Sequence, residues 1–157
     1  MDINEAKDEG LISDLPKEEN VTDIVEKEIK SAEYDLSEAK EGFSKGKTKW
    51  PVVQAYYVIF HAARALMYKF KLKEIKHEGI VVFLEERVKV GKLRNEFVTI
   101  FKSLKSTRED SNYDSDFSEE RARKSIESAE EFLKEMKAQL SEKKAGKTGK
   151  QFVFLLL

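Results

Sequence analysis

Apolar residues recur at helical spacing along two long segments of the chain, residues 21–43 and 118–140. In the first segment the apolar positions are Val25, Ile29, Ala32, Leu36, Ala39 and Phe43. In the second they are Ala122, Ile126, Ala129, Leu133, Met136 and Leu140. Both series alternate steps of four and three, which places their members on one face of a helix. The stripes predict two amphipathic helices; the polar stretch SKGKTK (44–49) ends the first, and Ser118, followed by two glutamates, begins the last.

Between these segments, residues 50–70 (WPVVQAYYVIFHAARALMYKF) are apolar almost all round, which predicts a central and largely buried helix. Pro51 suits the first turn of that helix, where a missing N–H costs no hydrogen bond. A segment of this length could also cross a bilayer, which needs about 20 apolar residues. Gln54, His61 and Arg64 inside it, and the basic residues directly after it, favour the core helix of a soluble protein, so we expect no membrane span.

Two shorter segments complete the predicted fold. HEGIVVFLEERV (77–88) is rich in β-branched residues, but the sequence offers no second strand to pair with it, so a helix is the better interpretation. After Gly91, helical stepping resumes at Leu93, Phe97, Phe101 and Leu104. The predicted fold class is all-α, an antiparallel up-and-down bundle of four to five helices over residues 21–141. Residues 1–20 are acidic and weakly patterned and are interpreted as an extension, and residues 142–157 as a basic and apolar tail.

The central helix carries a polar seam along one face. Its members are Gln54, Tyr57, His61, Arg64 and Tyr68. They follow one another at i, i+3, i+7, i+10 and i+14, so they lie on the same side of the helix. Buried donors and charges without partners are costly, and the seam therefore has to meet something polar. Another helix, a second subunit and a ligand are the three alternatives.

Charge is unevenly distributed along the chain. The net charge of −1 excludes a globally basic nucleic-acid-binding protein. Residues 64–94 nevertheless carry nine Lys or Arg against four Glu, whereas residues 109–120 carry six acids and no base. A basic middle beside an acidic turn permits contact with the phosphate of RNA or of a nucleotide, and solvated helix faces are the alternative.

Candidate redox and metal chemistry is sparse in this sequence. The absence of cysteine excludes disulfides, thiolate zinc sites and cysteine nucleophiles, and it suits a reducing, cytoplasmic environment. The acidic N-terminus lacks the apolar core of a secretory signal. With two histidines, of which neither belongs to an HExxH pair, we expect no metal and no cofactor. His61 is interpreted as a core residue with its polar atoms satisfied, and His77 as a helix cap or surface residue.

Arg108 is the residue where the pattern points to chemistry. The four/three stepping that passes through Leu104 reaches Arg108 next, so its side chain should face the core instead of solvent. A guanidinium in that position needs an acceptor. Either a carboxylate of the following acidic loop or a phosphate would serve.

Four segments occur in an order that resembles a known family. They are YYVIFHAARALM (56–67), KHEGIVVFLEERVKVGKL (76–93), REDSNY (108–113) and SEERARKSIESAEEFLKEMKAQL (118–140). Over about residues 21–141 the chain resembles HEPN domains, and more narrowly the small stand-alone prokaryotic proteins of that family. The resemblance implies a helical bundle that forms homodimers with paired arginine motifs at the interface. It also implies a metal-independent ribonuclease, often a toxin paired with a minimal nucleotidyltransferase.

The motif of that family is an arginine followed four to six residues later by a histidine. Arg108 matches the arginine, but Tyr113 stands where the histidine is expected. A tyrosine, with a reference pKa of about 10, is a poor base near pH 7, which weakens the expectation of ribonuclease activity. The resemblance still implies that Arg108 contacts phosphate. Tyr113 would donate a hydrogen bond or accept a nucleotidyl group from the partner enzyme.

The predicted site has two catalytic candidates, Arg108 and Tyr113. The binding candidates are Asn112, Asp110, His77, Arg64 and His61. We expect a protein that binds RNA or a nucleotide, with Arg108 on the phosphate. Two alternatives stay open. Arg108 could pair with an acid of the following loop while Tyr113 packs on the bundle, or the chain could be a non-catalytic dimerisation module whose seam holds a partner or a second copy.

Overall fold

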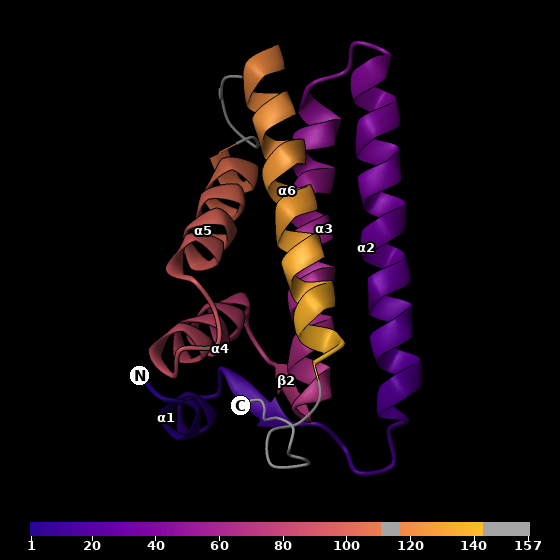
Figure 1. Ribbon diagram of the computed structural model, residues 1–157. Coiled ribbons are helices and arrows are strands. Elements are labelled where there is room, and N and C mark those ends of the chain that lie inside the picture. The colour runs from indigo at the N-terminus through magenta and orange to yellow at the C-terminus, as the bar shows by residue number, and fades with distance from the viewer. Residues whose placement is uncertain (111–116, 143–157) are drawn as a thin grey trace.

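The computed structural model describes residues 1–110 and 117–142, and most of them are helical (Figure 1). In chain order the elements are α1 (Ile3–Asp8), β1 (Ile12–Asp14), α2 (Val21–Ser44), α3 (Lys49–Lys69), β2 (Leu72–Glu74), α4 (His77–Lys89), α5 (Asn95–Asp110) and α6 (Glu119–Leu140). The long helices α2, α3 and α6 lie side by side, and α4 and α5 cover one side of this layer (Figure 1). The all-α prediction is confirmed.

Helix α3 is the centre of the bundle. It packs against α2, α4, α5, α6 and β2, and most of its residues are buried. Pro51 occupies its first turn, as the sequence indicates. Three phenylalanines pack together in the core beside α3. The ring centres of Phe97 and Phe101 in α5 lie 6.3 Å and 6.1 Å from that of Phe132 in α6. Burying one such side chain is worth roughly 1.5–3 kcal/mol, so this cluster holds α5 and α6 together.

Two helix starts are fixed by polar side chains at the position before the first turn. Asn20 accepts a hydrogen bond from the backbone N–H of Asp23 at the start of α2, at 3.1 Å. Ser118 accepts one from the N–H of Arg121 at the start of α6, also at 3.1 Å. Such caps satisfy backbone donors that a helix leaves unpaired at its start. The predicted start at Ser118 is thereby confirmed.

The N-terminal segment, predicted as an extension that precedes the bundle, carries secondary structure of its own. Within residues 3–14 the chain forms α1 and β1. Strand β1 pairs antiparallel with β2, with Ile12 opposite Glu74, and the side chains of Ala6 and Ile12 are buried in the core. A strand of three residues is too short to show an alternating pattern in the sequence. The helix did leave a signal, a capping box between Asp2 and Glu5.

The same segment fastens the start of α4. The carbonyl oxygen of Leu11 accepts hydrogen bonds from the backbone N–H groups of Ile75 and Lys76, at 2.8 Å and 3.3 Å. Gly79, in the first turn of α4, lies so close that a Cβ added there would stand 2.3 Å from that oxygen. Glycine is therefore required where α4 meets β1.

In the ranges 1–110 and 117–142, no helix combines the length and apolar character that crossing a membrane requires. This finding agrees with the interpretation of α3 as a core helix. Of the predicted C-terminal tail, residues 143–157 lie outside the described residues.

Candidate functional site

Arg108 lies in the last turn of α5 and faces α3. Its side chain is partly buried, and its Nη2 donates a hydrogen bond to the hydroxyl of Tyr57 at 3.3 Å. The central carbon of the guanidinium lies 5.6 Å from the ring centre of Tyr56 and 5.7 Å from that of Tyr57. In cation–π contacts of this kind the electrons of a ring face attract the cation. Arg108 is thus an oriented cation at the junction of α3 and α5.

Tyr56 connects this cation to a histidine. The phenol ring is 1% exposed, and its hydroxyl lies 2.8 Å from Nδ1 of His77, the first residue of α4. The ring of His77 also packs against that of Phe60, with 4.8 Å between the ring centres, while the histidine as a whole remains exposed. Arg108 and His77 therefore touch the same phenol, one from α5 and the other from α4.

The hydroxyl of Tyr56 keeps its proton. Burial raises the pKa of this phenol well above its ordinary value, and the positive charge of Arg108 opposes that shift only in part. Glu109 and Glu78 add to the upward shift. A protonated phenol can both donate and accept a hydrogen bond, so Tyr56 is a neutral link between two basic side chains.

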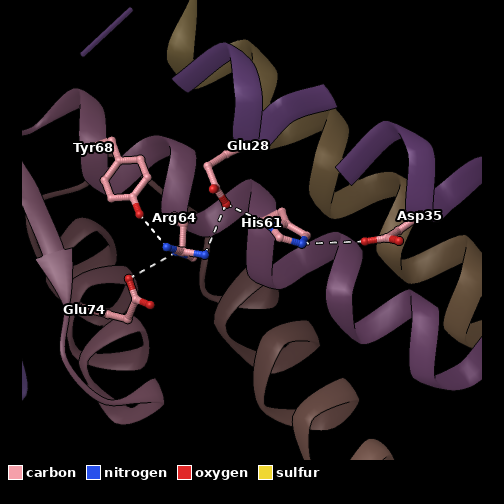
Figure 2. Close-up of polar contacts among 6 residues, drawn as sticks. All are labelled: Glu28, Asp35, His61, Arg64, Tyr68 and Glu74. Atoms are coloured by element: carbon pink, nitrogen blue, oxygen red, sulfur yellow. Dashed lines mark hydrogen bonds and ion pairs between the residues drawn. The ribbon is translucent and has the colours of Figure 1, made fainter. Parts of the chain in front are cut away.

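The polar seam of α3 forms a second cluster, shown in Figure 2. Nδ1 of His61 lies 2.8 Å from Oε1 of Glu28, and its Nε2 lies 3.7 Å from Oδ2 of Asp35. Both carboxylates come from α2, two helical turns apart on one face. Burial raises the pKa of Asp35, the charge of His61 opposes this shift and Glu38 adds to it. His61 is therefore held between two acids of the neighbouring helix.

Arg64 occupies the next turn of the seam and also meets two acids. Its Nη1 lies 3.5 Å from Oε1 of Glu28, its Nε lies 3.3 Å from Oε1 of Glu74 in β2, and its Nη2 donates to the hydroxyl of Tyr68 at 2.6 Å (Figure 2). The contact with Glu74 is ionic, because its angles do not suit a hydrogen bond. Burial acts to lower the pKa of Arg64, but Glu28, Glu74 and Tyr68 together raise it.

These contacts bear on the alternatives for the seam. The partners of His61 and Arg64 are α2 and β2 of the same chain, so an element of the bundle meets this part of the seam. Tyr57, at the other end, meets Arg108 of α5. Gln54 is buried, and within the described ranges its side-chain oxygen has no hydrogen-bond partner.

The structure thus sorts the predicted site residues into groups. It brings Arg108 and His77 together through Tyr56, and it places His61 and Arg64 in the separate cluster of Figure 2. Of Asp110 only its position as the last residue of α5 is described, and Asn112 and Tyr113 lie outside the described residues.

Sequence reasoning missed several partners of these residues. The role of Tyr56 could not be predicted, since a tyrosine within an apolar helix is most simply interpreted as a core residue. Glu28 and Asp35 did leave one, because they are seven residues apart and border the apolar stripe of α2. Within the described ranges, no three His, Asp or Glu side chains are grouped so that they could hold a metal ion.

Comparison with known proteins adds two kinds of similarity. Residues 25–139 match a model of the HEPN domain. Over 116 residues the chain is 34% identical to a Methanocaldococcus jannaschii protein named "putative toxin", an alignment that covers 73% of this chain and 87% of that protein. It is also 39% identical over 62 residues to a UPF0332 protein of Pyrococcus horikoshii, covering 40% of this chain but only 44% of that relative.

Proposed function

The chain belongs to the HEPN domain family, and from this premise we propose that it binds the phosphate of RNA or of a nucleotide through Arg108. We further propose that it is the toxin-like partner of a minimal nucleotidyltransferase and acts in the cytoplasm as a homodimer. The similarity to a protein named as a toxin supports the toxin-like role. The geometry around Arg108 supports the binding of phosphate.

The observation that carries the proposal is the way in which Arg108 is held. Two tyrosine rings and a phenol hydroxyl orient its guanidinium at the end of α5. A guanidinium is charged at every physiological pH and presents N–H donors in a planar fork that fits phosphate oxygens. An oriented cation binds an anion more tightly than a mobile one, because less conformational freedom is lost on binding.

The same group has a defined use if the protein cleaves RNA without a metal. In phosphodiester transfer the charge on the phosphate oxygens grows toward the transition state, and a fixed guanidinium stabilises that charge. Asn112 and Tyr113 follow Arg108 closely in the sequence, and we propose that they help to position the substrate. In a complex with a nucleotidyltransferase and ATP, the hydroxyl of Tyr113 would lose its proton and form a phosphodiester bond to the α-phosphate, and pyrophosphate would leave.

Binding is tested by fluorescence anisotropy with a labelled single-stranded RNA of about ten nucleotides, at low and at moderate salt. We expect Arg108→Ala to weaken binding about tenfold and Arg108→Lys to weaken it less, since a charge-assisted hydrogen bond is worth roughly 1.5–3 kcal/mol before competition with water and salt. Arg123→Ala, at an exposed arginine of α6, is the matched control and should bind like the wild type. Equal affinity of the Arg108→Ala variant and the wild type would refute the proposal.

Catalysis and partnership need separate measurements. Incubation of the same RNA with excess EDTA shows whether cleavage occurs without a metal, and an equal rate for Arg108→Ala would assign it to a contaminant. For the partner, the protein is incubated with a minimal nucleotidyltransferase and ATP, and intact-mass spectrometry detects a transferred nucleotidyl group. We expect that mass change in the wild type and its loss in Tyr113→Phe. Sedimentation velocity tests the homodimer.

A further inference from the structure

We infer that His77 is a second cation of the Arg108 site, one that acquires its charge by protonation, so that the site binds single-stranded RNA more tightly as the pH falls from 8 to 6. This inference rests on the proposed function and extends it. It adds a residue from another helix, a ligand with several linked phosphates, and a response to pH.

The placement of His77 is the first argument. Helix α4 begins with His77, and the histidine is exposed although its Nδ1 lies 2.8 Å from the hydroxyl of the buried Tyr56. The guanidinium of Arg108 lies 5.6 Å from the ring centre of that same tyrosine. Two basic groups are therefore held on one rigid phenol, while the exposure of His77 leaves its ring accessible to a ligand.

The chemistry of the phenol is the second argument. The hydroxyl of Tyr56 donates a hydrogen bond to Nδ1 when the imidazole is neutral, and it accepts one from Nδ1–H when the imidazole is charged. The histidine can therefore gain or lose a proton without losing its anchor. Imidazoles ordinarily change charge between pH 5 and 8, the range in which the effect is expected.

The charges around the two groups are mixed. The exposed acids Glu109, next to Arg108 on α5, and Glu78, next to His77 on α4, oppose the approach of an anion. Lys76 directly precedes the helix, which begins without a side-chain cap. The N-terminus of a helix carries a partial positive charge, and this adds to the attraction of an anion beside His77.

RNA fits this arrangement better than a single phosphate does. Arg108 and His77 are attached to different parts of the phenol, its ring and its hydroxyl, so consecutive phosphates of one strand can use both. The exposed ring of His77 packs against the half-buried ring of Phe60, and the outer face of such a ring offers a stacking surface to an unpaired base. We therefore assign the site to a single-stranded RNA segment.

The other histidine provides an internal control. The chain has only two histidines, and His61 lies between Glu28 and Asp35, which compensate its charge when it is protonated. Protonation of His61 should add little to the attraction of RNA. An increase in RNA affinity at low pH that requires His77 but not His61 can thus be assigned to protonation of His77.

The test measures the affinity of the full chain for a labelled uridine decamer without terminal phosphates, at pH 8 and pH 6 and at several salt concentrations. The diester phosphates of this probe keep the same charge over that range. We expect the affinity of the wild type to rise about threefold to tenfold at pH 6, where a tenfold change corresponds to a shift of about one pKa unit on binding. The slope of affinity against salt should steepen by about 0.7 at pH 6, as one further cation contacts the strand.

Three variants complete the design. His77→Gln keeps a hydrogen-bonding side chain without the charge and should bind equally at both pH values. His77→Arg carries a permanent charge and should bind tightly at both, whereas His61→Gln should respond to pH like the wild type. A His77→Gln variant that retains the full response overturns the inference but leaves the proposed function intact. Loss of the effect of Arg108→Ala at pH 8 would instead overturn the proposed function, and the inference with it.

Discussion

Replacing Arg64 with methionine should strongly destabilise the bundle. The exchange keeps the apolar stem of the side chain but removes the charge that compensates Glu74 and that, together with His61, faces Glu28. The side chains of Glu74 and Glu28 are only 12% and 11% exposed. Removing one partner of a buried ion pair costs about 3–5 kcal/mol, because the other charge is left without compensation. Arg64 itself is 22% exposed, so water enters and the loss should fall near the lower end, at about 3 kcal/mol.

This loss is large enough to measure directly. For a chain of 150–250 residues each kcal/mol lowers the melting temperature by roughly 2–4 °C, so we expect a decrease of about 6–12 °C. Urea denaturation at pH 7, followed by far-UV circular dichroism, gives the free energy of unfolding of each variant.

A second substitution tests the cause of the loss. Glu74→Gln alone should destabilise the protein by about 1 kcal/mol, because it weakens the contact with Arg64. In the Arg64→Met background the same change should restore about 1 kcal/mol of stability, because it removes the charge of a carboxylate that has lost its partner. If Glu74→Gln has the same effect in both backgrounds, or if Arg64→Met costs less than about 1 kcal/mol, the ion pairs of Figure 2 do not stabilise the packing of α3 on α2 and β2.

Two further predictions concern other parts of the bundle. Gly79→Ala should destabilise the protein by about 1–3 kcal/mol, because the new Cβ would meet the carbonyl oxygen of Leu11. Gly42→Ala in α2 should instead stabilise it by about 0.5–1 kcal/mol, because a Cβ there would lie 3.5 Å from its nearest neighbour. Thermal melts that show equal effects for the two variants would refute this. Asp35→Asn should stabilise the protein at pH 7 by less than about 1 kcal/mol, since burial raises the pKa of Asp35 and so makes its charged form unfavourable in the folded state. The gain should vanish as the pH falls below the ordinary value of 3.8, where the carboxyl is protonated with or without folding, and urea titrations between pH 3 and 7 would show it.

The long helices were predictable because each repeats its apolar pattern over several turns. The predicted start of the first helix at Val21 and its end in the stretch 44–49 agree with α2. Elements of three to six residues, such as α1, β1 and β2, were not predicted, because so few positions cannot show a helical or strand periodicity. Their stability comes from pairing and burial that only the folded chain supplies.

The site was predictable in part for a similar reason. The inward orientation of Arg108 follows from its spacing after Leu104 along one helix. Arg108 contacts Tyr56, and Tyr56 contacts His77, so these contacts join three helices. No local pattern in the sequence predicts which of several aromatic residues of α3 contacts both Arg108 and His77. The acids that hold His61 were also supplied by the neighbouring helix.

The hydrogen bonds accepted by Leu11 have a practical consequence for work on this protein. The part of the chain that HEPN domains share starts at residue 25, after α1 and β1. A protein trimmed to that region would keep His77 but lose the oxygen to which Ile75 and Lys76 are tied. Ligand measurements on such a shortened protein would therefore report on a loosened α4, so residues 1–20 should be retained whenever RNA binding is assayed.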